Sequence, residues 1–367
     1  MKTKIKYYII TVTFSILILA LFYEYNVRNE KPSYISDTTD VKSENVKKSE
    51  LNVLFIGDIM TDRYIRKQIN KYEKEDSVLG IENFVGKYLN NLSEINSKYD
   101  YVVANLEGPV TENKSKSLND DGTYGKDLIF TFPTSTIEIL SKLNIRVVSL
   151  ANNHTDNFYH KGYEDTKRFL EKENINYFGN PYNNNLEKLS EIICEKDICI
   201  AYIGYHQFTT NNLSEIVSKE IKRIKENNLE IEKNKIASQN KFVDFIVVMP
   251  HWGIEYDTIS NSKQKEYARD WIDSGADAVL GAHPHVIQES EIYKNKYIYY
   301  SLGNYIFDQW FTKDVQNGLG LDITFKKECI ENKDIKSLNN NICKKEIILN
   351  KELKVFIDRN GVKYDVL

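Results

Sequence analysis

The stretch NVLFIGDIM, residues 52–60, decides the fold. Its apolar run has high β-propensity and ends at Gly57 and Asp58, which predicts a buried strand followed by a turn that carries a carboxylate. Similar runs recur at 101–104, 146–150, 198–203, 242–249, 278–280 and 297–301. Amphipathic stretches typical of helices lie between them, at 85–95, 135–143, 162–172 and 262–274. This alternation predicts an α/β fold with a sheet buried on both faces.

Polar side chains begin where these predicted strands end. They are Asp58, Asn105, Glu107, Asn152, Asn153, His154, His251, His283, His285 and Asn304. In a mostly parallel sheet the carboxyl ends of the strands share one edge, where ligand sites of open α/β folds form. A single such residue is more typical of a turn or helix cap. Together they favour a metal or phosphate site over a structural polar cluster.

The donor types indicate which metals such a site would take. Four of the six histidines of the chain lie at these strand ends, together with carboxylates and amides and no cysteine. Mixed nitrogen and oxygen donors favour Mn²⁺, Fe or Zn²⁺ over Ca²⁺ or soft copper sites. His283 and His285 flank Pro284, so one rigid turn can aim two imidazoles at two nearby ions or at one chelated ion.

The N-terminus predicts a single membrane-spanning anchor over residues 1–25. Residues 7–23 carry no charge, and lysines at positions 2, 4 and 6 precede them. A run of this length is at the short end of the ~17–25 residues that span a bilayer. A cleaved signal peptide is the alternative, but no small-x-small pattern follows the run. The leading lysines predict a cytoplasmic N-terminus, with the remaining chain outside the cell membrane.

Three further segments follow the predicted anchor. Residues 26–50 are polar and predict a stalk. Residues 51–310 contain the alternating strands and helices and are expected to form the main domain. Residues 311–367 are expected to add edge strands and a tail without chemistry. The four cysteines, at positions 194, 199, 329 and 343, leave buried thiols and one or two disulfides open.

The composition excludes several classes of protein. The 367 residues are 41% hydrophobic and 28% charged, which excludes global disorder and a polytopic membrane protein. The net charge of −4 argues against a dedicated nucleic-acid binder. It is also mildly unfavourable for attracting a polyanion, so such attraction would have to be local, through a metal or through Arg63 and Arg66.

A set of motifs resembles the CapA capsule-biosynthesis family, the poly-γ-glutamate synthesis proteins. The motifs are GDIMTDRYI (57–65), DYVVANLEGPVTE (100–112), VVSLANNHTDNFYHKGYEDT (147–166), HWGIEYD (251–257), SGADAVLGAHPHVIQ (274–288) and YYSLGNYIFDQ (299–309). That family is similar to the calcineurin-like metallophosphoesterases. The resemblance implies a four-layer α/β/β/α sandwich with a two-metal centre.

The resemblance also implies roles for individual residues. His154 would be the catalytic histidine that protonates a leaving group. The implied metal ligands are Asp58, Asn105, Glu107, Asn153, His251, His283 and His285, with Asn152, Glu255 and Asn304 supporting them. One metal position is expected to be weakened because Met60 replaces a ligand histidine. Asn105 likewise stands where the phosphoesterases have a bridging aspartate, and Glu107 is a candidate substitute.

Two functions fit these observations. The first is an anchored accessory subunit of a polymer synthase and exporter, which binds or guides an anionic polymer such as poly-γ-glutamate. The second is an extracellular metal-dependent phosphoesterase or other hydrolase, in which the metal activates a water molecule. We favour the first cellular role, carried on the phosphoesterase type of fold. The expected partners are the membrane, other subunits of the synthase and exporter, and an anionic polymer or phosphoester, with no nucleic acid.

Overall fold

The computed structural model describes residues 46–90, 92–119, 123, 125, 128–182, 188–209, 214–234, 242–330 and 342–365. These residues lie within one unit of the chain, 45–367. The predicted anchor and residues 26–45 of the predicted stalk lie outside the described residues. Within the described ranges, no helix combines the length and apolar character needed to cross a bilayer.

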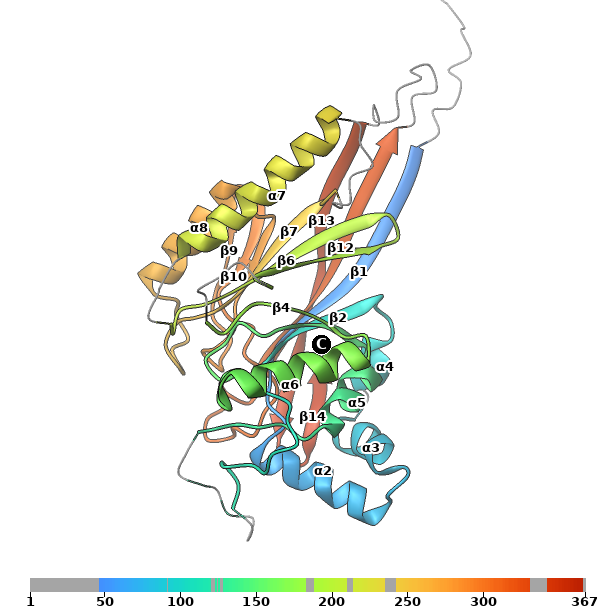
Figure 1. Ribbon diagram of the computed structural model, residues 1–367, viewed down its shortest axis with the longest axis vertical. Helices are drawn as coiled ribbons and strands as arrows, with labels where there is room; N and C mark the ends of the chain where they lie inside the picture. The colour runs from blue at the N-terminus through green and yellow to red at the C-terminus, as the bar shows by residue number, and fades with distance from the viewer. Residues whose placement is uncertain are drawn as a thin grey trace, which may run out of the picture. The chain divides into compact units, whose positions relative to one another are not determined.

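A mixed sheet of eight strands contains residues 52–59 in its strand β1 (Figure 1). Its strands are β1 (Val46–Ile59), β2 (Tyr101–Leu106), β3 (Ile145–Ser149), β4 (Asn176–Phe178), β11 (Asn304–Ile306), β12 (Asn317–Ile330), β13 (Ile342–Asp358) and β14 (Gly361–Asp365). The order is β14-β13-β12-β1-β2-β3-β4, and β11 also pairs with β1. β1 to β4 are parallel, so their carboxyl ends lie at one edge.

The second sheet has six strands and is also mixed. They are β5 (Ser190–Glu195), β6 (Ile198–His206), β7 (Phe245–His251), β8 (Ala278–Leu280), β9 (Ser290–Tyr293) and β10 (Lys296–Tyr299). The order is β5-β6-β7-β8-β10-β9. The four inner strands are parallel, whereas the two edge strands β5 and β9 are antiparallel to their neighbours.

Helices cover the outer faces of the two sheets. The first sheet packs against α2 (Arg63–Glu75), α3 (Gly80–Asn83), the π-helix η1 (Phe84–Tyr88), α4 (Leu92–Asn96), α5 (Ser135–Lys142) and α6 (Tyr159–Lys172). The second sheet packs against α7 (Ser214–Asn234) and α8 (Ser262–Ser274). The predicted helix at 85–95 is thus divided between η1 and α4.

Three buried cores join these elements into four layers. The alternation of β1 sends Leu54 into the core under the first group of helices and Phe55 into the core between the sheets. Tyr202 meets Phe55 from the second sheet, with ring centroids 6.1 Å apart. Ile203 faces the third core, with Trp271 of α8. The predicted α/β fold is therefore confirmed, with helices on both outer faces of two mixed sheets.

One predicted segment boundary and the predicted place of one strand differ from the structure. β1 already begins at Val46, so the last five residues of the predicted stalk, 46–50, are strand residues paired with β12. β12 is an interior strand between β1 and β13 and not the predicted edge strand. The physical reason is that every second side chain of β12 is apolar and faces the second sheet, so that Leu321, Ile323 and Phe325 are buried between the sheets. The C-terminal segment is thus part of the first sheet.

The cysteines form two disulfides, which settles the alternative that the sequence left open. Cys194 pairs with Cys199 across β5 and β6, and Cys329 pairs with Cys343 across β12 and β13. In both cases the two residues stand directly opposite each other in the strand register. Each disulfide therefore joins two neighbouring strands of one sheet.

Candidate metal centre

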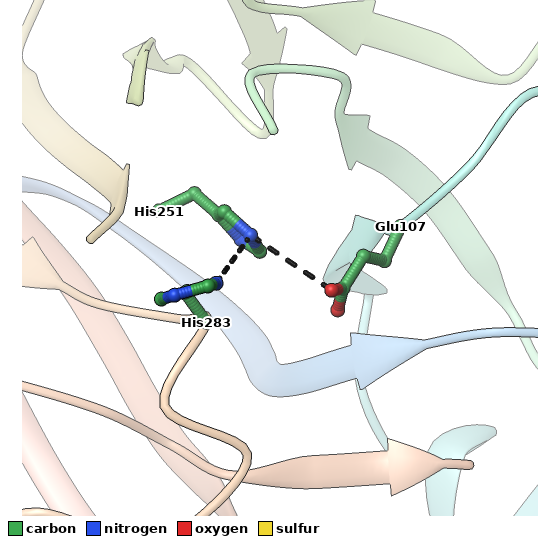
Figure 2. A group of neighbouring side chains, drawn as sticks. All are labelled: Glu107, His251 and His283. Atoms are coloured by element: carbon green, nitrogen blue, oxygen red, sulfur yellow. Dashed lines mark hydrogen bonds and ion pairs between the residues drawn. The ribbon is translucent and has the colours of Figure 1, made fainter. Parts of the chain in front are cut away.

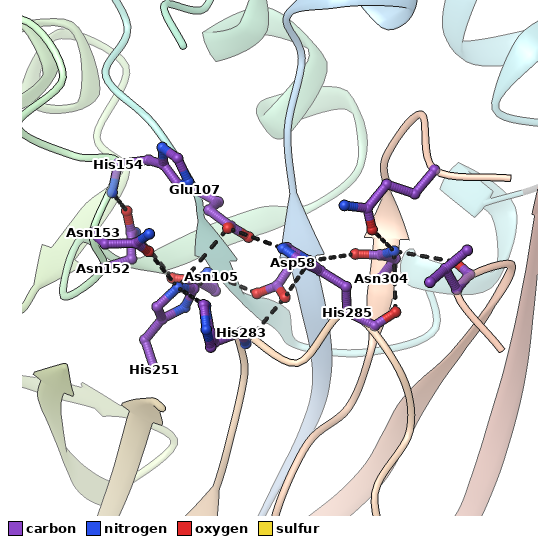
Figure 3. Close-up of polar contacts among 12 residues, drawn as sticks. Asp58, Asn105, Glu107, Asn152, Asn153, His154, His251, His283, His285 and Asn304 are labelled. Carbon is purple, nitrogen blue, oxygen red and sulfur yellow. Dashed lines mark hydrogen bonds and ion pairs between the residues drawn. The ribbon is translucent and has the colours of Figure 1, made fainter. Parts of the chain in front are cut away.

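Asp58 reaches the site from the carboxyl end of β1. It stands in register with Asn105 of β2 on one side and Asn304 of β11 on the other. Its backbone N–H donates to the carbonyl of Gly303 at 3.0 Å. A Cβ atom on Gly57 would lie 1.8 Å from that carbonyl oxygen, so glycine is needed for β11 to come this close to β1. Figure 3 shows the side chains that gather around Asp58.

The turn after β8 carries two of the histidines. His283 and His285 both have left-handed backbones, with φ of 98° and 59°. Such values are uncommon for residues with a Cβ and concentrate at functional sites. The N–H of His283 donates to Asp58 Oδ2 at 3.2 Å, which ties the turn to β1. The strained turn thereby holds both imidazoles at the strand-end edge.

Glu107 is the centre of this cluster. It is fully buried, and among the described residues neither of its carboxylate oxygens has a hydrogen-bond partner. Burial raises its pKa well above the usual range. Its Oε1 atom lies 3.5 Å from His285 Nε2. The same atom lies 3.9 Å from His251 Nε2, as Figure 2 shows. A buried carboxylate without hydrogen bonds is costly, and a cation in this space would compensate for it.

The spacing of the donor atoms fits a metal site. Donors that bind one ion at about 2.1 Å lie about 3.0–3.4 Å apart in octahedral or tetrahedral coordination. Three sets of donors lie within 4.8 Å of one another, and Glu107 belongs to two of them. The sets are Asp58, Glu107 and His285; Glu107, His251 and His283; and Glu255, His283 and His285. The described residues thus fit one ion or two neighbouring ions that share Glu107.

Asn304 fixes the orientation of His285. The Asn304 amide Nδ2 donates to the carbonyl of Val315 at 3.1 Å, so its Oδ1, 3.0 Å from His285 Nδ1, is free to accept. His285 Nδ1 therefore carries a hydrogen, and Nε2 faces Glu107. Burial disfavours the charged ring, but the carboxylates of Glu107 and Asp58 outweigh burial and raise the pKa of His285 to about 9.

His251 and His283 form the other half of the cluster. His251 Nε2 lies 3.1 Å from His283 Nδ1 and 2.8 Å from the Asn153 Oδ1 atom. Burial lowers the pKa of both histidines, and the positive charge of neighbouring histidines adds to the effect. Neutral imidazole is the form that binds metal ions. These three side chains therefore bring together three donor atoms of the type that the sequence predicted.

Asn105 lies between Asp58 and His251. Its Nδ2 donates to Asp58 Oδ1 at 2.7 Å and lies 3.2 Å from His251 Nδ1. Its Oδ1 accepts from Asn152 Nδ2 at 3.1 Å. Both ends of the Asn105 amide are thus engaged, and its contacts hold Asp58 and His251 in place. Asn152 supports Asn105, as well as the backbone of the loop that carries His154.

His154 lies beside the cluster, on the side of Glu107 (Figure 3). Its Nδ1 is 3.0 Å from Asn157 Oδ1, which also accepts the N–H of Phe130 at 2.7 Å. The shared acceptor assigns the hydrogen to Nδ1 of His154 and the lone pair to Nε2. The Phe130 ring packs against the imidazole, with the two ring centroids 4.4 Å apart. Burial lowers the pKa of His154 to about 4, so the ring is neutral at pH 7.

Met60 and Glu255 complete the predicted set. The sulfur of Met60 accepts the N–H of Asp62 at 3.1 Å and lies in the core under the helices, away from the donor cluster. Glu255 is exposed, but its carboxylate lies within the third donor set, with His283 and His285. Its carboxylate thus lies near two histidines of the cluster.

Two residues near the site were missed by the sequence analysis. His206 ends β6 directly opposite His251 in the register, and its Nε2 is 2.7 Å from the carbonyl of Pro181. His206 could have been found from the sequence, because it follows a predicted strand as the other histidines do. Phe208 packs its ring 4.3 Å from the ring of His283. It lies in a loop where no pattern singles it out.

The fold and the donor cluster together describe an α/β protein with a candidate divalent-metal site at its strand-end edge. Residues 52–309 match the family described as "Bacterial capsule synthesis protein PGA_cap". The chain belongs to this family. Similarity to two CapA proteins agrees with this. The chain is 30% identical over 270 residues to the PGA biosynthesis protein CapA of Bacillus subtilis (strain 168), covering 73% of this chain and 66% of that protein.

Further relatives extend the comparison. The chain is 28% identical over 277 residues to the capsule biosynthesis protein CapA of Bacillus anthracis, covering 74% of this chain and 63% of that protein. The chain thus spans about two thirds of the length of these curated relatives. Among solved structures, a novel phosphatase of Mycoplasma pneumoniae aligns with a TM-score of 0.45 and 14% identity, over 82% of this chain and 95% of that one.

Proposed function

We propose that this protein is a membrane-anchored, extracellular component of capsular poly-γ-glutamate synthesis and export, and that its domain carries a divalent-metal centre. The family is one of capsule synthesis proteins. One observation carries the metal centre: Glu107 is fully buried between His251 and His285, and neither of its oxygens has a hydrogen-bond partner in the part of the chain that the structure describes. The proposed ion is Mn²⁺, Fe or Zn²⁺, because the donors are nitrogen and oxygen.

The two disulfides support the extracellular placement. Disulfides persist in oxidising compartments and are rare in the cytosol. Both pairs of cysteines, Cys194 with Cys199 and Cys329 with Cys343, are joined in the domain. The membrane anchor is proposed from the uncharged run at 7–23, which lies outside the described residues. The other synthase subunits and an anionic polymer are the proposed partners.

The residues that would hold the metal have distinct tasks. Asp58, Glu107 and His285 would hold one ion, and His251, His283 and Asn153 would complete a second position around Glu107. When bound, such an ion polarises a phosphoryl or carbonyl oxygen and lowers the pKa of a bound water. Asn304 keeps the hydrogen of His285 on Nδ1, and Asn105 keeps Asp58 and His251 in place.

The alternative function is a metal-dependent phosphoesterase or other hydrolase of the cell envelope. The position of His154 favours it, because Asn157 fixes the tautomer and leaves Nε2 as a proton acceptor next to the cluster. A neutral histidine with a fixed tautomer can accept a proton from a water or hydroxyl group and return it to a leaving group. His154 would then be the catalytic residue.

Complementation separates these functions. In a strain that lacks the gene, His285→Ala is expected to abolish polymer secretion because the metal is lost. His154→Ala is expected to keep both metal and secretion if the protein guides the polymer, and to abolish secretion with metal retained if it is a hydrolase. His160→Ala, an exposed residue on α6, is the matched control and should behave as wild type. Full secretion with His285→Ala would contradict both functions.

A further inference from the structure

Tyr256, in the loop between β7 and α8, has a strained backbone beside the metal centre. Its φ of 69° lies in the left-handed region, which is an outlier for a bulky residue. Such strain concentrates at functional sites. The N–H of Tyr256 donates to the carbonyl of Pro284 at 2.8 Å, and Pro284 stands between His283 and His285. The backbone of Tyr256 is therefore fixed to the turn that carries two candidate metal ligands.

The ring of Tyr256 is the half-exposed neighbour of His285. In the part of the chain that the structure describes, the rings of His283, Phe307 and Tyr256 lie next to the imidazole of His285. His283 and Phe307 are buried, whereas Tyr256 is 43% exposed, with its ring centroid 6.2 Å from that of His285. His285 itself is only 3% exposed. Tyr256 is therefore the aromatic side chain that covers His285 on the solvent side.

Gln309 holds the hydroxyl group of Tyr256. The Asn304 Nδ2 atom donates to the carbonyl of Val315 at 3.1 Å and to Gln309 at 3.2 Å, so the Gln309 atom that faces it is the acceptor Oε1. The Nε2 atom of Gln309 is then directed to the Tyr256 hydroxyl oxygen and donates to it at 3.2 Å. Because Asn304 also contacts His285, hydrogen bonds run from His285 through two amides to Tyr256.

The backbone and the side chain of Tyr256 are thus tied to His285 by separate routes. The backbone route runs through Pro284, and the side-chain route runs through Gln309. The ring of Phe311 adds an edge-on contact with the Tyr256 ring, with the centroids 5.1 Å apart. An exposed side chain without contacts keeps its rotamer freedom. These contacts instead hold the Tyr256 ring beside His285.

We propose that Tyr256 is a positioning residue that covers the solvent side of His285 in the metal centre, and that Gln309 anchors this cover. The shell around a metal site controls how easily solvent reaches the ligands. The cover keeps the Nε2 atom of His285 toward Glu107 and slows the exchange of water and of a bound ion. The inference rests on the proposed function for the ion, whereas the cover over His285 depends only on contacts within the protein.

The first measurement needs no metal. Exchange of the Nδ1–H proton of His285 with water is followed by NMR in metal-free protein labelled with 15N-histidine. Tyr256→Asn removes the ring, and asparagine tolerates the left-handed backbone. It should accelerate this exchange by about tenfold, because water then reaches the imidazole after a small local opening. The Nε2–H proton of His206, which is donated to the carbonyl of Pro181 at 2.7 Å, should exchange at the wild-type rate.

The second measurement is the release of Zn²⁺ from loaded protein into excess EDTA. Tyr256→Asn should release the ion about tenfold faster than wild type. Tyr256→Phe keeps the ring but loses the hydroxyl that Gln309 holds, and Gln309→Leu loses the amide, so each should accelerate release by about threefold. Tyr159→Asn is the matched control, because Tyr159 is exposed and also has a left-handed backbone, with φ of 55°. It should release the ion at the wild-type rate.

The two measurements separate the cover from the metal centre. If wild-type protein holds no metal, the proposed function fails, while exchange of the His285 proton still tests the cover. Exchange of this proton at the wild-type rate in Tyr256→Asn would overturn the inference. Equal acceleration of the His285 and His206 protons would do the same, because it would indicate a general loss of stability. Zinc release that is equally fast from Tyr256→Asn and Tyr159→Asn would also contradict the proposed cover.

Discussion

Two buried carboxylates at opposite ends of the sheets differ in how they are neutralised. Asp244, at the start of β7, accepts the N–H of Cys199 at 2.9 Å and pairs with Lys327 at 3.0 Å and Lys345 at 3.1 Å. Glu107, directly after β2, has no lysine or arginine at ion-pair distance among the described residues; its neighbours are the imidazoles of His285 at 3.5 Å and His251 at 3.9 Å. Lysines supply the counter-charges at one end, whereas histidines, which are also common metal ligands, surround the carboxylate at the other.

The residues around the two carboxylates also differ. Around Asp244, both disulfides and the lysines line a cavity of about 710 Å³ at the end where β1 begins. Around Glu107, the backbones of His283 and His285 are strained. Disulfides and ion pairs with lysine stabilise a fold, whereas backbone strain concentrates at functional sites. The comparison therefore contrasts an end of the domain held by disulfides and lysine pairs with an end that carries the candidate site.

The largest expected effect comes from Asp244→Asn. The substitution leaves two mostly buried lysines without their counter-charge and should lower the free energy of unfolding by about 3 kcal/mol. Urea denaturation measures this change, and metal content should stay at the wild-type level. A change below about 0.5 kcal/mol would mean that the pairing of Asp244 does not stabilise the domain.

Asn304→Ala should have an intermediate effect, on metal binding. Without Asn304 the imidazole of His285 loses the acceptor that fixes its tautomer, and loss of such a partner lowers metal affinity by about 10–100-fold. Titration of metal-depleted protein with Mn²⁺ or Zn²⁺ measures the affinity. Asn350→Ala, an exposed amide on β13, serves as the control. Equal affinities for both variants would remove His285 from the ligand set.

The smallest expected effect on stability comes from Glu107→Gln in metal-free protein. Glu107 is buried and has no lysine or arginine partner among the described residues, so its replacement by a neutral amide should leave the free energy of unfolding unchanged or raise it by about 1 kcal/mol. Urea denaturation in the presence of EDTA measures the free energy of unfolding of this variant and of Asp244→Asn under the same conditions. A loss of stability as large as that of Asp244→Asn would erase the contrast between the two ends.

The sequence predicted the strand-end site because parallel strands place their carboxyl ends at one edge. Asp58, His251 and His285 are far apart in the chain, yet the alternation of strands and helices was sufficient to place them together. The contacts that surround each donor were not predictable. The hydrogen bond between the amides of Asn152 and Asn105, for example, leaves no pattern in the sequence.

The position of the C-terminal strands in the sheet could also not be predicted from the sequence. β12 is lysine-rich at its end, which is typical of an exposed edge, whereas Leu321 and Phe325 are buried between the sheets. Pairing between β1 and a strand more than two hundred residues away is a long-range contact without a local signal. The disulfide pattern was left open for the same reason, because it depends on strand register.

Metal quantitation tests the central claim most directly. The purified protein, analysed by inductively coupled plasma mass spectrometry, should contain about one to two equivalents of Mn, Fe or Zn per chain. Glu107→Gln and His285→Ala should lose most of this metal, while His160→Ala keeps it. Wild-type protein that holds no more transition metal than His285→Ala, even after incubation with Mn²⁺ or Zn²⁺, would contradict the account.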